Sequence, residues 1–238
     1  MRLDKMLAHL GYGSRKEVKE YIRKGFVMVN GETVRNDDFK VDEENDEIIF
    51  LDQELHYEKM LYFILNKPDG YVSATYDSRD PIVLDLIDGH ENRGLFPVGR
   101  LDKDTTGLLL ISNDGKLAHK LLSPTKHVDK VYELTFDGTF KNAYHKYFLE
   151  GIVLDDGYKC MPATFELLEP NKGRITIKEG KYHQVKRMMQ ALGMEVTTLK
   201  RIEFGPLSLP EDLKLGEYRE LTAEEMDILG ISELHAAL

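Results

Sequence analysis

One short stretch of the chain gathers several residue types that can do chemistry. Residues 99–107 read Gly-Arg-Leu-Asp-Lys-Asp-Thr-Thr-Gly, which places the carboxylates of Asp102 and Asp104 two residues apart. The pattern Asp-x-Asp-x-Thr-Gly resembles the first half of an EF-hand calcium loop, but the twelfth position is Asn113 and not the bidentate glutamate that such a loop needs. A metal site is therefore the weaker interpretation. The other is a tight turn in which the aspartates accept hydrogen bonds from their own backbone.

Other residues that could bind a charged substrate are spread along the chain. The stretch Glu-Gly-Lys-Tyr-His-Gln-Val-Lys-Arg-Met contains His183, Lys186 and Arg187, although a lone histidine is more often structural than catalytic. Tyr132 lies in an alternating strand pattern, where spacing alone favours a core aromatic residue. Lys67 lies in a predicted turn, where a lysine can simply be solvated.

The charge of the chain is segregated. Its 32 Lys and Arg against 42 Asp and Glu give a formal net charge of −10, which taken alone argues against a polyanionic partner. Residues 1–30, however, hold seven basic and three acidic residues, a net of +4, and residues 172–201 hold eight and two, a net of +6. Residues 31–58 hold two and eleven, a net of −9. Two basic segments could therefore meet a phosphate backbone.

The first basic segment predicts two helices and a hairpin. Apolar residues recur at helical spacing from Leu3 to Leu10, and Ser14 begins a capping box for a second helix that Gly25 ends. Asn30-Gly31 between apolar runs predicts a type I′ hairpin turn. The face of the second helix opposite its apolar residues is basic, and spacing alone does not tell a solvated face from a binding face. That face carries Arg15, Lys16, Lys19 and Arg23.

The remainder predicts an α+β domain. Residues 51–59 are polar and aperiodic, which indicates a linker. Strands outnumber helices after it and no regular βαβ alternation occurs, so we expect a mainly antiparallel mixed sheet with flanking helices. Strands are predicted at 61–65, 108–111, 131–135 and 174–177, a helix at 184–192, and a last short helix capped by Thr222. The predicted division is a domain with its linker at 1–58 and a second domain at 59–238.

Two sets of motifs resemble known families. Residues 1–50 resemble an S4 RNA-binding domain, through Arg2-Leu3-Asp4-Lys5, Ser14-Arg15 and Val27-x-Val29-Asn30-Gly31. The 99–108 stretch resembles the catalytic signature of the RsuA-type pseudouridine synthases. Three further motifs agree with that family and come in its order: Leu65-Asn66-Lys67-Pro68-x-Gly70-Tyr71, Lys130-Val131-Tyr132, and the 179–188 stretch.

The resemblance implies a reaction and three catalytic residues. The family isomerises a uridine within RNA without a cofactor or metal: the glycosidic bond breaks, the uracil turns, and C5 bonds to the ribose. Asp102 matches the family's catalytic aspartate, and its action on the base, on the sugar or on a ribose proton stays open. A carboxylate that must stay ionised away from water needs a nearby cation. Lys186 matches that basic partner, with Arg187 as the alternative, and Tyr132 matches the tyrosine that stacks on the target base.

The resemblance also implies substrate contacts. Arg100 resembles the arginine that holds the uridine flipped out of its stack. Leu199 is expected to pack under Tyr132, Lys67 to touch phosphate, and Arg187 to bind substrate if it does not pair with Asp102. His183 and Gln184 are expected to support the loop around Lys186. In the S4-like domain, the residues expected to meet RNA are Arg2, Arg15, Lys16, Lys19 and Arg23.

The sequence therefore predicts an rRNA pseudouridine synthase. Small-subunit (16S) rRNA is favoured because the two-domain layout and the short acidic C-terminus resemble the small-subunit members, whereas several large-subunit relatives add a long basic tail. The alternatives are a large-subunit enzyme and a non-catalytic S4-type assembly factor. The partner is rRNA, free or within an assembly intermediate. With one cysteine, no apolar run of membrane-spanning length and no signal-peptide pattern, we expect a cytoplasmic monomer without a membrane partner.

Overall fold

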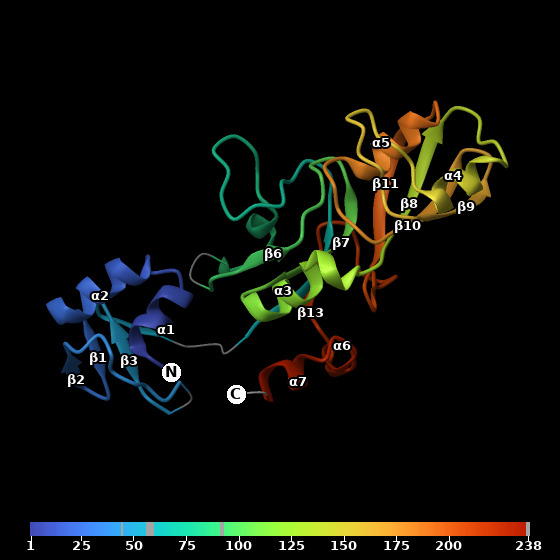
Figure 1. Cartoon of the computed structure of the whole chain (residues 1–238). Helices are drawn as coiled ribbons and strands as arrows, with labels where there is room; N and C mark the ends of the chain where they lie inside the picture. The colour runs from blue at the N-terminus through green and yellow to red at the C-terminus, as the bar shows by residue number, and fades with distance from the viewer. Residues whose placement is uncertain (44, 56–59, 91–92, 237–238) are drawn as a thin grey trace.

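The computed structural model describes residues 1–43, 45–55, 60–90 and 93–236, arranged as a small N-terminal block beside a larger one (Figure 1). The described helices are α1 (Leu3–His9), α2 (Arg15–Lys24), α3 (Gly115–Leu122), α4 (Tyr144–Glu150), α5 (Gln184–Ala191), α6 (Ala223–Ile228) and α7 (Ile231–Ala236), with 3₁₀ turns η1 (Val83–Leu86) and η3 (Pro124–Lys126). The strands are β1 (Val27–Val29), β2 (Glu32–Val34), β3 (Ile48–Phe50), β4 (Gln53–Leu55), β5 (Tyr62–Lys67), β6 (Phe96–Val98), β7 (Thr106–Ser112), β8 (Lys130–Asp137), β9 (Thr164–Glu169), β10 (Lys172–Ile177), β11 (Glu195–Phe204), β12 (Leu207–Ser208) and β13 (Tyr218–Glu220).

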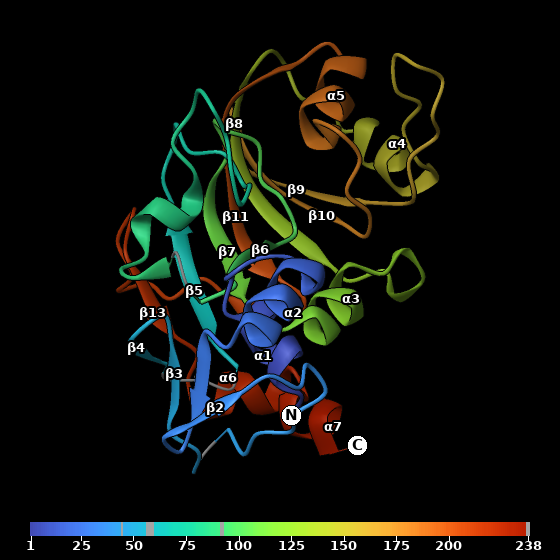
Figure 2. The ribbon, with the colours of Figure 1, turned by 90° about the vertical axis from the view of Figure 1, so that its left-hand side faces the viewer.

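The N-terminal block forms where its local signals predict it. The Ser14 side chain accepts a hydrogen bond from the Glu17 backbone, the Glu17 carboxylate accepts one from the Ser14 backbone, and Gly25 ends α2 with a φ of 82°. Asn30 and Gly31 have φ values of 49° and 80°, so the predicted type I′ turn joins β1 to β2. Together α1 and α2 bury their apolar faces against the four-stranded sheet β2-β1-β3-β4 (Figure 2).

The linker prediction is wrong in its first half. Residues 53–55 form β4, which pairs with β3 and buries Leu55 in the core of the N-terminal block. Only Leu55 of this three-residue edge strand is buried, so its sequence pattern is too short to distinguish it from a linker. Residues 56–59, and with them the predicted boundary between residues 58 and 59, lie outside the described residues.

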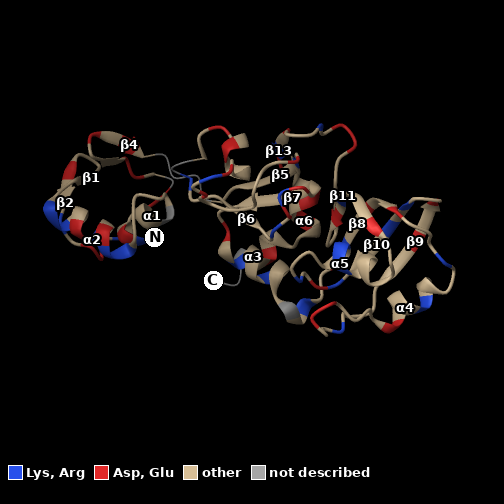
Figure 3. Ribbon diagram, turned by 90° about the horizontal axis from the view of Figure 1, so that it is seen from above, with Lys and Arg blue, Asp and Glu red and all other residues tan. Residues whose placement is uncertain are grey.

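The larger block is built on a nine-stranded sheet in the order β13-β5-β7-β11-β8-β10-β9, with β12 beside β11 and β6 beside β7. The strand pairs described are antiparallel except for β7 with β11, which confirms the mainly antiparallel mixed sheet. Flanking helices cover it: α5 lies against β11, and α4 lies against β9. Viewed from above, the N-terminal block, the β5–β7 half and the β8–β10 half follow one another (Figure 3).

The two halves of this sheet meet through a short contact. β7 pairs with β11 only at Thr106–Lys200 and Gly107–Arg201, and farther along it pairs with β6 instead. Gly107 has a φ of 100°, and a Cβ there would lie 2.2 Å from the carbonyl oxygen of Arg201. Only glycine permits this approach, so Gly107 fixes the end of the 99–107 loop against β11.

The C-terminal segment returns to the first half of the sheet. β13 pairs with β5, and Thr222 caps α6 through a capping box with Glu225. The prediction that this is the last helix is wrong, because Gly230 separates it from α7. Among the described residues, no helix has the length and apolar character needed to cross a membrane.

Candidate active site

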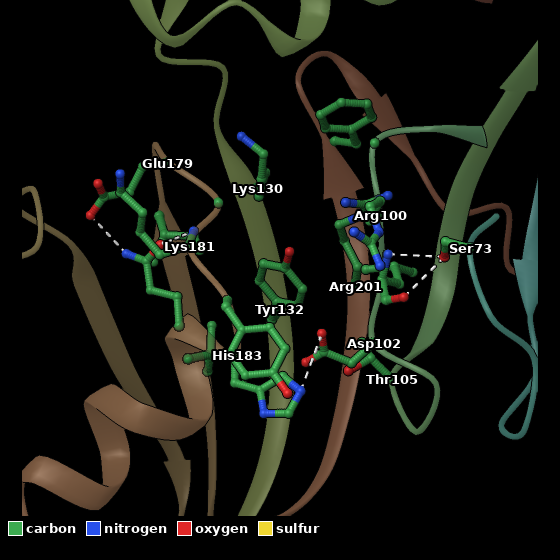
Figure 4. A pocket seen from close by; sticks show the side chains of 18 of the residues that line it. Ser73, Arg100, Asp102, Thr105, Lys130, Tyr132, Glu179, Lys181, His183 and Arg201 are labelled. Atoms are coloured by element: carbon green, nitrogen blue, oxygen red, sulfur yellow. Dashed lines mark hydrogen bonds and ion pairs between the residues drawn. The ribbon is translucent and has the colours of Figure 1, made fainter. Parts of the chain in front are cut away.

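A cavity of about 1180 Å³ opens where the two halves of the sheet meet (Figure 4). The 99–105 loop before β7 forms one wall, β8 and β11 form the floor, and the 178–185 segment leading into α5 forms the opposite wall. Three motifs far apart in the sequence therefore face one space. Of the residues predicted for the site, Arg100, Asp102, Tyr132 and Leu199 line this cavity.

Asp102 lies between two nitrogen atoms that come from the α5 segment. Its Oδ2 is 3.6 Å from Lys186 Nζ, and its Oδ1 is 3.7 Å from His183 Nε2. The Asp102 side chain keeps 29% of its surface exposed, toward the cavity. The structure thus brings the carboxylate and its predicted cation together, and it adds a histidine contact that was expected only as loop support.

Lys186 also binds a second carboxylate. Its Nζ donates a hydrogen bond of 2.5 Å to Asp104 Oδ1, shorter than its contact with Asp102. Burial raises the pKa of the Asp104 carboxyl, but this hydrogen bond and the lysine charge outweigh it and leave that pKa lowered. The two carboxylates of the loop therefore share one ammonium group, which holds the loop against α5.

Lys67 does not lie where a phosphate could reach it, and this prediction needs correction. Its side chain is fully buried beneath the loop, where Nζ donates to the backbone carbonyls of Lys103 at 2.9 Å, Thr105 at 2.8 Å and Pro68 at 3.1 Å. Burial lowers the pKa of Lys67 to about 8, although the nearby carboxylates oppose this. Lys67 therefore supports the Asp102 loop from inside.

Arg187 faces away from Asp102. Its guanidinium binds Asp155 at 2.6 Å through Nε and Asp156 at 2.7 Å through Nη2, and these hydrogen bonds raise its pKa. On a helix, neighbouring residues point about 100° apart, so Lys186 and Arg187 cannot both face Asp102. The alternative pairing of Arg187 with Asp102, and its expected substrate contact, do not agree with this placement.

Tyr132 and Leu199 lie on the floor of the cavity. Tyr132 in β8 pairs with Arg201 in β11, and Leu199 lies two residues before Arg201, so these three side chains share one face of the sheet. Arg201 is 1% exposed, and its Nε donates to the carbonyl oxygen of Leu108 at 2.8 Å. Burial lowers the pKa of Arg201, and the neighbouring Tyr132 opposes this shift.

The loop on either side of Asp102 is held by short polar contacts. The Ser73 hydroxyl donates to the Leu101 carbonyl at 3.0 Å and accepts from the Leu101 amide at 3.1 Å. Arg100 is exposed at the cavity rim and forms no ion pair or hydrogen bond with the described residues. A free guanidinium at the mouth of the cavity is suited to a phosphate or a base edge.

The α5 wall is held by Gln184, as predicted for this residue. Gln184 accepts a hydrogen bond from the Lys181 amide at 2.9 Å and donates one to Glu179 at 2.8 Å. His183 adopts a left-handed φ of 49°, which turns its ring toward Asp102. The exposed ring of Tyr182 stacks on His183 with centroids 3.8 Å apart. The wall therefore presents an aromatic surface beside the carboxylate.

Comparison with known proteins agrees with this geometry. The family model described as RNA pseudouridylate synthase matches residues 61–191, and the S4 domain model matches residues 1–48. The chain belongs to the RNA pseudouridylate synthase family. It is 46% identical to the RNA pseudouridine synthase YtzG of Bacillus subtilis (strain 168), covering 96% of this chain and 98% of that protein. It is 40% identical to ribosomal small subunit pseudouridine synthase A of Escherichia coli (strain K12), covering 95% and 98%.

A solved structure confirms the fold. A crystal structure of a pseudouridylate synthase superposes with a TM-score of 0.69 at 38% identity, covering 96% of this chain and 99% of the other. The predicted fold class, with a small S4 domain and a mixed sheet with flanking helices, is therefore confirmed, and so is the family to which the motifs pointed.

In the S4 domain of this synthase, most of the predicted RNA-binding side chains are already paired with acids. The buried Asp4 carboxylate binds Arg2 and Arg15 at 2.9 Å each and lies 3.8 Å from Lys19. Arg23 binds Asp37 at 2.7 Å. Burial raises the pKa of Asp4, but the hydrogen bonds from Arg2 and Arg15 outweigh it and lower that pKa.

The fifth predicted contact differs from these four. Lys16 is exposed on α2 and forms no ion pair with the residues that the structure describes. The basic face that the helix spacing predicted does exist (Figure 3), but acids of the same domain offset much of its charge. RNA binding at Arg2, Arg15, Lys16, Lys19 and Arg23 stays a prediction.

Three site residues of the synthase were missed from the sequence. Asp104 was considered only for a metal or a turn, Arg201 only as part of a basic segment, and Ser73 not at all. The Asp104–Lys186 distance depends on how α5 approaches the loop, and the Arg201–Tyr132 pair depends on strand register. The signal that was available is the spacing of Asp102 and Asp104, since two carboxylates beside one predicted cation can share it.

Proposed function

We propose that this chain converts a specific uridine of ribosomal RNA to pseudouridine, with small-subunit rRNA as the substrate. The observation that carries the proposal is the position of Asp102, which lines a cavity large enough for a nucleotide together with Tyr132 and lies 3.6 Å from Lys186 Nζ. The named relatives support the choice of RNA. The E. coli relative, which is 40% identical over nearly its full length, is named ribosomal small subunit pseudouridine synthase A.

The reaction balances within the substrate. The bond between N1 of uracil and C1′ of the ribose breaks, the uracil turns, C5 bonds to C1′, and the proton lost from C5 is balanced by one gained at N1. A carboxylate can start this by adding to the base, attacking C1′ or removing a ribose proton, and each route needs an ionised Asp102 beside the nucleoside. Lys186 and His183 lie where they stabilise that charge.

The remaining residues bind and orient the nucleotide. Tyr132 on the floor stacks on the uracil or donates its proton to it, while Leu199 packs below. Arg100 at the rim holds the flipped nucleotide, since this guanidinium has no partner among the described residues. The S4 domain, proposed to span residues 1–58 with its linker, binds structured rRNA through α2, whether the rRNA is free or in an assembly intermediate.

We place the enzyme in the cytoplasm as a monomer, acting without a cofactor. The one cysteine, Cys160, is buried and free, and burial raises its pKa to about 11, which agrees with a reducing compartment. The reaction itself transfers no electrons, so the proposed residues suffice for its proton and charge balance.

The test is to map pseudouridine in both rRNAs from a strain that lacks the gene. We expect one small-subunit position to lose its pseudouridine, and wild type to restore it. Asp102→Asn should restore nothing yet bind the RNA with wild-type affinity, whereas Asp137→Asn, at an exposed strand end, should restore the modification. A position lost in large-subunit RNA would overturn the substrate. Full conversion by Asp102→Asn would overturn the mechanism, and no lost position would favour a non-catalytic assembly factor.

A further inference from the structure

The cavity continues beyond the residues assigned to the nucleoside. Its volume of about 1180 Å³ exceeds the roughly 300–1,000 Å³ of sites that hold one small ligand. Asp102 and His183 lie on one side of Tyr132, and Lys130 lies on the other (Figure 4). The described lining also includes Arg201, Phe204, His127 and Val128.

A β-bulge in β11 places Arg201 and Phe204 on the same face of the sheet as Lys130. Tyr132 is opposite Arg201 and Lys130 is opposite Phe204, although two residues separate Arg201 from Phe204 in β11. The register shift between Arg201 and Glu203 absorbs the extra residue, so that both Arg201 and Phe204 face the cavity. The Phe204 ring lies 4.7 Å from the Arg201 guanidinium carbon and 5.7 Å from Lys130 Nζ.

Lys130 and Arg201 form no ion pair with the described residues. Lys130 Nζ donates to the Val128 carbonyl at 2.9 Å. Burial and the neighbouring Arg201 charge lower the pKa of Lys130, although Asp129 and Glu179 oppose this. Glu179 accepts hydrogen bonds from the Tyr158 hydroxyl at 2.6 Å, and from Gln184 and the Met161 amide at 2.8 Å each, so its carboxylate is held away from direct contact with Lys130.

Arg201 lies beneath this part of the cavity. It is 1% exposed, and its Nε donates to the carbonyl oxygen of Leu108. Its charge is therefore held close to Lys130 but is not itself open to a ligand. Two neighbouring positive charges repel each other, and an anion that binds Lys130 relieves this repulsion.

We propose that Lys130, with the charge of the buried Arg201 beside it, binds a backbone phosphate of the RNA next to the target uridine. The proposal deepens the proposed function and rests on it, because it names a phosphate contact at the same site. Residues two apart on a strand are about 6.4–6.8 Å apart, so Lys130 lies one such step from Tyr132. With the base beside Tyr132 and Asp102, an adjoining phosphate reaches Lys130 without leaving the cavity.

The experiment removes the charge from each side of the contact in turn. Lys130→Met is compared with wild type on two RNA fragments that carry a neutral methylphosphonate on the 5′ or the 3′ side of the target uridine. For one of the two, wild type should bind about tenfold more weakly than to unmodified RNA, because a charge-assisted hydrogen bond is lost. Lys130→Met should bind unmodified RNA about as weakly, and the methylphosphonate should cost it nothing more.

Two controls separate this contact from general effects. Lys130→Arg keeps the charge and should retain most of the affinity, while Lys172→Met, a β10 lysine outside the cavity lining, should leave affinity unchanged. The salt dependence of binding should fall by about 0.7 in slope for Lys130→Met alone. If both methylphosphonates weaken wild type and Lys130→Met equally, or neither weakens wild type, the subsite is refuted. Conversion of the unmodified RNA by wild type shows in the same assay that the proposed function stands.

Discussion

Replacement of Lys67 by methionine tests whether the Lys67 ammonium group is excluded from water beneath the Asp102 loop. Methionine matches the length of the lysine side chain but has no charge and no donor, so it leaves the three carbonyls of Pro68, Lys103 and Thr105 without their shared partner. The contribution of Lys67 to the free energy of unfolding should depend on pH in a way that an exposed lysine would not show. Because Lys67 is fully buried, its pKa falls from an ordinary 10.5 to about 8 in the folded protein.

The direction of this pH dependence follows from whether the folded or the unfolded chain keeps the Lys67 proton. Between pH 8 and 10.5 the unfolded chain keeps the lysine proton and the folded chain has lost it, so the free energy of unfolding rises with pH. At 1.36 kcal/mol per pKa unit, the lowered pKa corresponds to about 3 kcal/mol gained by wild type over this interval. Lys67→Met lacks this titrating group, so its free energy of unfolding should not show this gain. Below pH 8 the difference between the two proteins should be constant.

The measurement is urea unfolding followed by circular dichroism, at a series of pH values between about 7 and 10.5. The difference in unfolding free energy, wild type minus Lys67→Met, should grow by about 3 kcal/mol, and other titrating groups cancel in it. Lys103→Met is the matched control from the same loop. A hydrogen bond to Asp80 raises the pKa of Lys103 above its ordinary 10.5, so its difference should stay constant over this pH range. A difference for Lys67→Met that does not change with pH would show that this lysine is accessible to water, contrary to the structure.

Three further substitutions have direct expectations. Gly107→Ala should destabilise the fold by about 3 kcal/mol or more in urea unfolding, because its Cβ meets the Arg201 carbonyl at 2.2 Å, whereas Gly70→Ala, with open space around it, should cost only the strain of its positive φ, about 1 kcal/mol. Tyr182→Ala should weaken RNA binding by about 5- to 100-fold, and Tyr182→Phe should not, if the exposed ring stacks on a base; equal losses in both would exclude stacking. Lys16→Ala should lower the salt slope of RNA binding by about 0.7, and an unchanged slope would leave α2 as a solvated face.

Local signals in the sequence predicted the elements well. A capping box, a glycine stop and an Asn-Gly turn depend on residues within a few positions of each other, and Ser14, Gly25 and Asn30 act as these patterns indicate. The apolar runs at 61–65 and 108–111 likewise became the adjacent strands β5 and β7. Where an element buries only one face over three residues, as in β4, the pattern was too short to distinguish from a linker.

The site was predicted less completely because its geometry depends on long-range register. Motif order identified Asp102 and Lys186, but whether Lys186 or Arg187 faces Asp102 depends on the rotation of α5, and the structure selects Lys186. Lys67 was misjudged because a turn in the sequence gives no indication that a later loop folds over it. Arg201 became visible only when the pairing of β8 with β11 placed it opposite Tyr132.

The distribution of unpaired cations explains how a chain with a net charge of −10 can still bind RNA selectively. Most basic residues of the S4 helix are offset by Asp4 and Asp37, which limits attraction to any phosphate backbone that approaches that domain. Two cations that form no ion pair with the described residues line the cavity, Arg100 on the rim and Lys130 on the floor. RNA that extrudes a nucleotide into the cavity would bring it close to both groups, so we expect these two cations to favour a substrate that flips its base.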